Sequence, residues 1–295
     1  MSDAPPELLA AAEVLDSGTG GPGHKTSRAT LAVAGIVAIH AGLLAYGAWC
    51  HSAAWDEVGH FAAGLSHWKL GHFRLYRVNL PLVRLVATAP VLLAHPVLDW
   101  DEISADPHQR PEWEVGKKLA KANGRRYFRL LTLARWACIP FSIMGALVCR
   151  RWASDLYGPT SGLFALVLYC FCPNIITYGQ LIVPDAPAAA LGAAAHYMFW
   201  RHLENPHWKR SVGIGTVFGL MQLCKSTWVF AFLYWPMLWA VDRVVRRHAP
   251  GRQRAAVSLA QLATILGLGL FVLNAGYLFQ GSFKRLGDYS FQSMA

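Results

Sequence analysis

The chain has 295 residues, of which 54% are apolar and 15% are charged, and its mean hydropathy is +0.30. Soluble domains carry about 25% charged residues, so this composition excludes an ordinary soluble domain. The formal net charge of +10 comes from short basic clusters between apolar runs, a pattern typical of topology signals beside membrane helices rather than of a nucleic-acid-binding surface. We expect an all-α integral protein of the cell membrane with about seven transmembrane helices.

The N-terminal segment, residues 1–28, is rich in Pro, Gly, Ser and Ala, and this composition predicts a flexible tail. The tail opens with acidic residues, and the first apolar run begins too late for a secretory signal peptide. That run, from Ala29 to Cys50, exceeds the roughly 20 residues that span a bilayer, so it predicts the first transmembrane helix. Residues 29–295 are then expected to form a polytopic membrane domain.

A long segment with many charged, Trp and His side chains follows, and we expect residues 51–128 to form the first outer loop. Within it, residues 56–70 predict an amphipathic helix. Phe61, Leu65 and Trp68 are three or four residues apart and would therefore share one helix face.

The second apolar stretch of this loop, residues 80–98, is interrupted by Arg84, Pro90 and Pro96. We expect an interfacial or re-entrant helix here, and a complete span is the alternative. The residues that follow, 99–128, are polar and predict an exposed loop.

Further spans are expected along the rest of the chain. The apolar run 211–241 is too long for one span and is broken at Lys225, so it is divided there into two. The other expected spans are 130–148, 158–178, 183–200 and 255–279. With the N-terminal tail in the cytoplasm, every cytoplasmic connection is basic, as the positive-inside rule requires. An additional span at 80–98 would invert all later loops, so this agreement supports leaving that stretch non-spanning.

The cysteines and histidines do not predict a metal site. Six cysteines lie within or at the ends of apolar runs, without the Cys/His spacing of a zinc site, and are expected to be small buried apolar residues. The histidines are scattered. No metal ligand is assigned, and a requirement for a divalent metal is left open.

Four charged residues at the expected outer face are the candidates for chemistry. Asp56 and Glu57 follow the first span, Asp185 lies at the start of a later span, and Lys225 separates two apolar helices. Each has a simple structural alternative, because Asp is a preferred helix cap and Lys reaches the membrane interface by snorkelling. Together they suggest group transfer from a lipid phosphate: a carboxylate deprotonates the acceptor hydroxyl, and a cation stabilises the charge on the departing phosphate.

Several motifs resemble the GT-C membrane glycosyltransferases, in particular the protein O-mannosyltransferase and aminoarabinose-transferase-like group. The motif of Asp-Glu, a His three residues on and a Gly is found at 55–64, and Gly-His-Phe-Arg-Leu follows at 71–75. Similar stretches are found at 150–158, 172–185, 223–225 and 274–283. The resemblance covers about residues 30–290 and depends on the order and spacing of short motifs.

The resemblance implies a role for each of these residues. Asp56 would be the catalytic base, with Glu57 beside it in the acidic motif and Asp185 as a second acid that orients the acceptor or supports the site. Lys225 would contact the donor phosphate. Arg135 matches an arginine common in the family, with either a phosphate-binding or a structural role. His60 and Asn79 would support the site.

The substrates follow from the same resemblance. The donor would be a polyprenyl-phosphate-linked sugar, transfer would be inverting, and the acceptor would be a hydroxyl of a protein, lipid or glycan at the outer face. No cofactor is assigned, and the expected partners are this donor, the acceptor and membrane lipids, with no nucleic acid.

Two departures from the family pattern keep a second hypothesis open. The family commonly has His-Pro-Pro-Leu where this chain has Asn79-Leu80-Pro81-Leu82, which weakens any claim of metal or acceptor binding there. The chain also ends soon after its last expected span, where relatives continue, so we expect it to be an N-terminal part. The alternative is a non-catalytic or truncated membrane protein, a transporter or scaffold derived from such a transferase.

Overall fold

The computed structural model describes residues 22–100, 111–246 and 253–288, and this part of the chain is all-helical. Most of the expected flexible tail, residues 1–21, lies outside the described residues. The first described helix, α2, is Pro22–Cys50 and begins earlier than expected.

Ten further α-helices follow within these ranges, with two short 3-10 helices, η1 and η2. Three of them come from the predicted outer loop: α3 (Trp55–Leu70), α4 (Leu82–Leu92) and α5 (Glu112–Asn123). The others are α6 (Arg126–Tyr157), α7 (Pro159–Cys170), α8 (Pro173–Tyr178), α9 (Asp185–Glu204), α10 (Trp208–Gln222), η1 (Ser226–Phe230), α11 (Ala231–Val245), α12 (Ala255–Gly276) and η2 (Leu286–Asp288).

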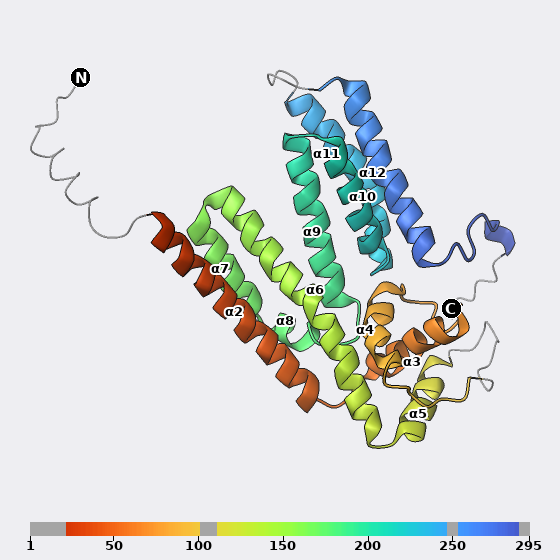
Figure 1. Cartoon of the computed structure of the whole chain (residues 1–295). Helices are drawn as coiled ribbons and strands as arrows, with labels where there is room; N and C mark the ends of the chain where they lie inside the picture. Colours follow the sequence, from red (N-terminus) through yellow and green to blue (C-terminus); the bar gives the residue numbers. More distant parts are fainter. Residues whose placement is uncertain (1–21, 101–110, 247–252, 289–295) are drawn as a thin grey trace, which may run out of the picture.

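The long helices form two groups that meet where α6 packs on α9 (Figure 1). Helices α2, α6 and α7 make the first group, and α9, α10, α11 and α12 make the second. The helices of the predicted outer loop, α3, α4 and α5, lie together at one end and are called the loop layer. Within it α3 packs on α4 and α5, and α4 also packs on α6. The main core is therefore continuous from this loop layer into the bundle.

Four helices of the described part are long and apolar enough to cross a membrane: Arg28–Cys50, Arg126–Tyr157, Ser226–Val245 and Ala255–Gly276. This agrees with the predicted all-α membrane protein, and the division of 211–241 at Lys225 is confirmed by the break between α10 and η1. Helix α4 has 11 residues, or about 16 Å at 1.5 Å per residue. It is too short for the ~30 Å hydrocarbon core, as the non-spanning prediction requires.

The prediction of an exposed loop over 99–128 is wrong for α5. Val115 and Leu119 of this helix are buried against the main core, and Gly116 lies so close to Val58 of α3 that an added Cβ would be 2.5 Å from the Val58 carbonyl oxygen. The buried residues form a narrow apolar stripe on α5. The polar residues on its exposed side made the segment resemble a loop in the sequence. Residues 101–110 of the expected loop lie outside the described residues.

Two other predictions need correction. The expected span 158–178 is divided into α7 and α8, because Pro173 disfavours helical geometry at Cys172, whose ψ of 123° is extended. In α3, Phe61 and Leu65 are buried, but Trp68 is 49% exposed and its indole N–H donates to the Leu85 carbonyl. That helix is therefore enclosed by neighbours rather than amphipathic at an interface.

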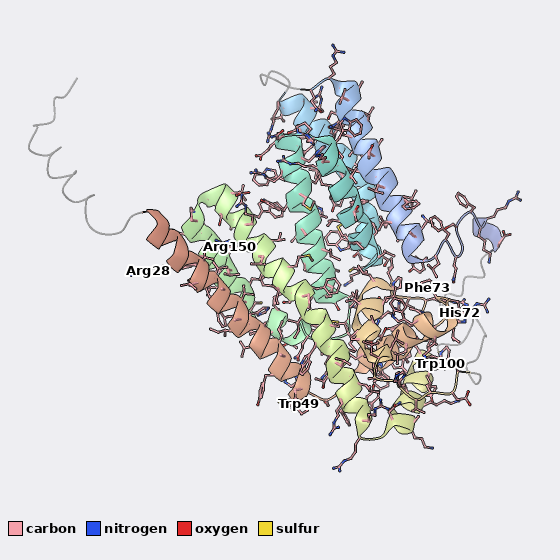
Figure 2. All side chains as sticks on the ribbon, viewed as in Figure 1. Arg28, Trp49, His72, Phe73, Trp100 and Arg150 are labelled. Carbon is pink, nitrogen blue, oxygen red and sulfur yellow. The ribbon has the colours of Figure 1, made fainter. Side chains whose placement is uncertain are left out.

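The two ends of the α2–α6 pair differ in their side chains. Arg28 and Arg150 lie near one end, and Trp49 lies at the other, on the side of the loop layer that carries His72, Phe73 and Trp100 (Figure 2). The predicted catalytic residues belong to this second end.

Candidate active site

A buried ion pair lies at the start of the loop layer. Arg135 of α6 and Glu57 of α3 are 1% and 0% exposed, and two hydrogen bonds join them, from Nε to Oε1 at 2.9 Å and from Nη2 to Oε2 at 2.6 Å. Glu57 is the third residue of α3, and its carboxylate also accepts the backbone N–H of Ala54, which satisfies one free donor at the helix start.

The ion pair fixes three segments that are distant in sequence. Besides Glu57, Arg135 donates to the carbonyl oxygens of Ala48, His51 and Ser52, at 3.1, 2.8 and 2.8 Å. Glu57 also accepts the backbone N–H of Ile182, at 3.1 Å. All five N–H donors of the guanidinium are thereby used. Between the two roles open for Arg135, these contacts favour the structural one, because no donor remains for a phosphate.

Asp56 is next to this pair and has the opposite environment. Its side chain is exposed and makes no hydrogen bond or ion pair within the described residues. The capping alternative is not realised, because the N-cap of α3 is Ala54 and Asp56 is the second helical residue. A free carboxylate is thus held beside a fixed one, on the first turn of a buried helix.

Asp185 and Lys225 form a second, more accessible pair. Nζ of Lys225 is 2.7 Å from Oδ1 of Asp185, and their side chains are 39% and 52% exposed, respectively. Asp185 is the first residue of α9, after the N-cap Pro184, so the negative charge also suits the positive end of the helix dipole. Lys225 lies at the break before η1, in extended geometry.

The two residues that were expected to support the site, His60 and Asn79, also lie close together. The Asn79 amide lies 3.5 Å from Nε2 of His60 and 3.3 Å from the Tyr76 hydroxyl, and the Tyr76 ring packs against the His60 ring. Burial, and secondarily the positive charge of Arg84, lower the pKa of His60 to about 3. This imidazole is therefore neutral at physiological pH and serves as a packed hydrogen-bonding group.

Backbone contacts join these pairs into one region. Ile182, bonded to Glu57, lies three residues before Asp185, and the N–H of Leu82 donates to the carbonyl of Leu223 at 3.2 Å, two residues before Lys225. The structure thus gathers the acidic motif, the 79–82 segment and both sides of the Asp185–Lys225 pair. Asp56 and the Asp185–Lys225 pair do not touch, and they are connected through Glu57.

Arg84 is a residue of this region that sequence reasoning treated as no more than an interruption of an apolar run. It is 1% exposed and donates to the carbonyl oxygens of Tyr76 and Leu80, while its guanidinium lies 5.1 Å from the Tyr76 ring centre. Burial lowers its pKa to about 10. A charge inside an apolar stretch was the available signal, since such charges are rarely placed there without a partner.

Metal ligands do not gather in this region. Across residues 22–100, 111–246 and 253–288, no three His, Cys, Asp or Glu side chains are close enough together to hold a metal ion. The chemistry available from these residues is a free carboxylate, a lysine–aspartate pair and neutral polar groups.

Comparison with known proteins finds a family model that matches part of the helical bundle. Residues 130–275 match the family model described as dolichyl-phosphate-mannose-protein mannosyltransferase. The match includes Arg135, Asp185 and Lys225 and begins after the Asp56 motif. No curated protein and no solved structure matches the chain. This match supports a GT-C type of membrane glycosyltransferase.

Proposed function

We propose that this protein transfers a sugar from a polyprenyl-phosphate-linked donor to a hydroxyl acceptor at the outer face of the membrane, with Asp56 as general base. The family match supports a mannosyltransferase-type activity. The observation that carries the finer proposal is an exposed carboxylate, Asp56, directly beside the buried Glu57–Arg135 pair, with no competing protein partner among the described residues.

The proposed reaction inverts the anomeric carbon. Asp56 accepts the proton of the acceptor hydroxyl, and the hydroxyl oxygen forms a bond to that carbon. The bond between the anomeric carbon and the phosphate oxygen breaks, and its electron pair leaves with the polyprenyl phosphate. A positioned base of this kind contributes about 100- to 10,000-fold to rate.

Glu57 and Arg135 have a positioning role in this proposal. Their mutual contacts and the backbone groups they hold fix the first turn of α3, and with it the backbone position of Asp56. Since Glu57 is fully buried and already accepts four hydrogen bonds, it is not a second base.

Lys225 is the proposed donor-phosphate ligand. Its ammonium is partly exposed and is bonded to Asp185, so a phosphate would compete with that carboxylate for the same N–H groups. Asp185 would hold Lys225 in place between turnovers and orient the acceptor during them. A cation placed where charge develops on a leaving group contributes roughly 100-fold or more.

The test is sugar transfer from radiolabelled polyprenyl-phosphate sugars by the full chain in membranes. Asp56→Asn is expected to remove transfer, while Asp99→Asn, a change of another exposed acid of the same loop, leaves it intact. Lys225→Met is expected to weaken donor use, with Lys69→Met as the matched exposed lysine. Full activity of Asp56→Asn would remove the base assignment. No transfer by the correctly inserted wild type would instead favour a non-catalytic protein.

A further inference from the structure

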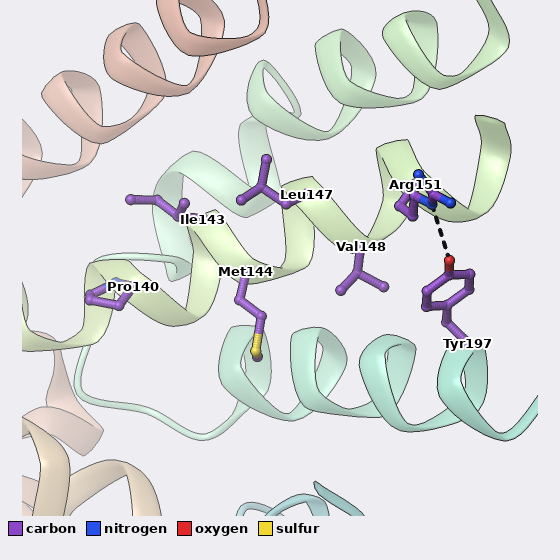
Figure 3. Close-up of a pocket in the computed structure, with 7 residues that line it drawn as sticks. All are labelled: Pro140, Ile143, Met144, Leu147, Val148, Arg151 and Tyr197. Carbon is purple, nitrogen blue, oxygen red and sulfur yellow. Dashed lines mark hydrogen bonds between the residues drawn. The ribbon is translucent and has the colours of Figure 1, made fainter. Parts of the chain in front are cut away.

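A groove runs along α6, away from the loop layer and the candidate active site. It has a volume of about 470 Å³ and is lined by residues 140, 143, 144, 147, 148 and 151 of α6 and by Tyr197 of α9 (Figure 3). The α6 residues recur every three or four positions and therefore form one uninterrupted helix face. This face is open, since Pro140 is exposed and Leu147 is 42% exposed.

The groove is apolar along its length and polar at one end. From Pro140 to Val148 its side chains present carbon and sulfur atoms, and at its end Nε of Arg151 donates to the Tyr197 hydroxyl at 3.3 Å. The distance along α6 from Pro140 to Arg151 is about 16 Å at 1.5 Å per residue. That is about half of the ~30 Å hydrocarbon core, the depth of one leaflet.

The charges at the polar end leave an excess of positive charge. Asp155 lies 3.2 Å from Arg151 and 3.4 Å from Arg201, so one carboxylate is shared between two guanidinium groups. Glu204 is more distant from Arg201, at 4.0 Å, and Arg150 adds a further positive charge beside Arg151. The Arg151 side chain remains 62% exposed, so its other N–H groups are accessible to an anion.

We propose that this groove binds one anionic glycerophospholipid, with an acyl chain along the Pro140–Val148 face and the headgroup phosphate at Arg151. The groove length matches a chain of one leaflet, and the excess positive charge matches the phosphate. The arginine end is the end near Arg150 and Arg28, opposite Trp49 and the loop layer. The proposed lipid therefore belongs to the leaflet opposite the one in which the donor phosphate would react.

The experiment is native mass spectrometry of the full chain released from detergent, titrated with palmitoyl-oleoyl phosphatidylglycerol and, separately, the matching phosphatidylcholine. One phosphatidylglycerol is expected to remain bound after mild activation. Val148→Trp fills the groove and is expected to abolish this adduct. Leu233→Trp introduces a tryptophan on α11, where Leu233 is 67% exposed, and is expected to leave the adduct unchanged.

A second variant tests the headgroup contact. Arg151→Gln is expected to reduce the preference for phosphatidylglycerol over phosphatidylcholine by roughly fivefold, the effect of about one basic side chain at an anionic lipid surface. Arg254→Gln, at an exposed position just before α12, is the control and is expected to keep the preference. The same preference in Arg151→Gln as in wild type would remove the headgroup from Arg151.

Three further results would overturn the proposal. Equal phosphatidylglycerol binding by wild type and Val148→Trp would place the lipid elsewhere. One-for-one displacement of the phosphatidylglycerol adduct by added polyprenyl phosphate would make the tail of the donor the occupant. A dimer mass that disappears in Val148→Trp would make a second copy of the chain the occupant.

Discussion

Neither Glu57 nor Arg135 has a hydrogen-bonding group left for a ligand. Arg135 gives all five donors to protein acceptors, and Glu57 accepts from Arg135, Ala54 and Ile182. A pair buried this completely is costly to break from one side, because the remaining charge stays in a low-dielectric environment.

Replacing the arginine of this pair is therefore expected to destabilise the protein strongly. Arg135→Met leaves Glu57 buried without a cation and removes the donors to three carbonyl oxygens, which should cost about 3–5 kcal/mol. Thermal unfolding in detergent, followed by tryptophan fluorescence, measures the effect. Arg129→Met alters an exposed arginine of the same helix and should change the midpoint little. Equal midpoints for both variants would contradict the structural role.

His60 gives a prediction about acid stability. Burial and then Arg84 lower the pKa of this imidazole from 6.5 to about 3, so between these two values the unfolded chain binds a proton that the folded chain does not. The stability contributed by the neutral imidazole is complete above the unfolded pKa and is lost as pH falls below 6.5 toward the folded pKa. At about pH 5.5 the loss from this residue is about 1.4 kcal/mol.

The matched variants are His60→Gln and His207→Gln, the latter at an exposed position. Denaturant unfolding at neutral pH and at about pH 5.5 should show a smaller acid-induced loss in His60→Gln than in wild type or His207→Gln. If His60→Gln lost as much stability in acid as wild type, His60 would bind a proton in the folded protein as readily as in the unfolded chain.

Sequence reasoning predicted some of the residues that lie close together in the structure, but not their contacts. Asp185 and Lys225 were expected at the outer face, and His60 and Asn79 were expected to support the site. In the structure Asp185 contacts Lys225 and His60 contacts Asn79. The saturation of Arg135 was not predictable, because it depends on carbonyl oxygens at the end of α2 that come close only when α2, α3 and α6 pack together. The catalytic roles of these residues stay predictions.

At the scale of elements, the packing of α10 on α12 depends on small residues. A Cβ added to Gly219 would overlap Cβ of Val272 and would lie 2.8 Å from the carbonyl oxygen of Gly269. Gly215, one turn earlier, is in similarly close contact with α12. The two glycines form a Gly-x-x-x-Gly pattern, which lets membrane helices approach closely.

Gly219→Ala is accordingly expected to force α10 and α12 apart and to lower stability by about 1–3 kcal/mol, the usual cost of overpacking. Gly213→Ala is the control on the same helix, since its nearest atom beyond the helix is a methionine methyl at the ordinary distance of 3.7 Å. Its thermal midpoint should match or exceed that of wild type, because alanine favours a helix. Equal midpoints of the two variants would contradict the tight α10–α12 contact.

The elements themselves were predictable where composition alone decides them. The break at Lys225 followed from one charge in a long apolar run, and it separates α10 from η1. Helix α5 was missed although Pro111 precedes it and Gly124 follows it, because its apolar stripe is narrow and is completed only by contact with α3. Pro173 was a local signal for the division of α7 from α8, but the hydropathy of the run favoured a single span.

At the scale of the whole molecule, the asymmetry of charge predicts an orientation. Arg28 and Arg150 lie toward one end of the bundle, and Trp49 lies toward the other. The positive-inside rule puts the arginine end in the cytoplasm and the loop layer outside. The exposed thiol of Cys50, next to Trp49, should therefore be accessible from outside the cell.

Labelling of intact cells with a membrane-impermeant maleimide, mapped by peptide mass spectrometry, tests this orientation. Cys50 is expected to react in intact cells. A cysteine introduced by Asn205→Cys, at the exposed residue that follows α9, should react only after the membrane is permeabilised. The reverse pattern would invert the topology and move the proposed site to the cytoplasm.

The long sequence separation of the Glu57 contacts has a consequence for biosynthesis. Arg135 is 78 residues and Ile182 is 125 residues beyond Glu57. At roughly 5–20 residues per second, the ribosome delivers these partners about 4–16 and 6–25 seconds after the glutamate. During that interval Glu57 has neither its counter-charge nor its backbone donor, so the first turn of α3 cannot reach its final packing before these later segments have been made.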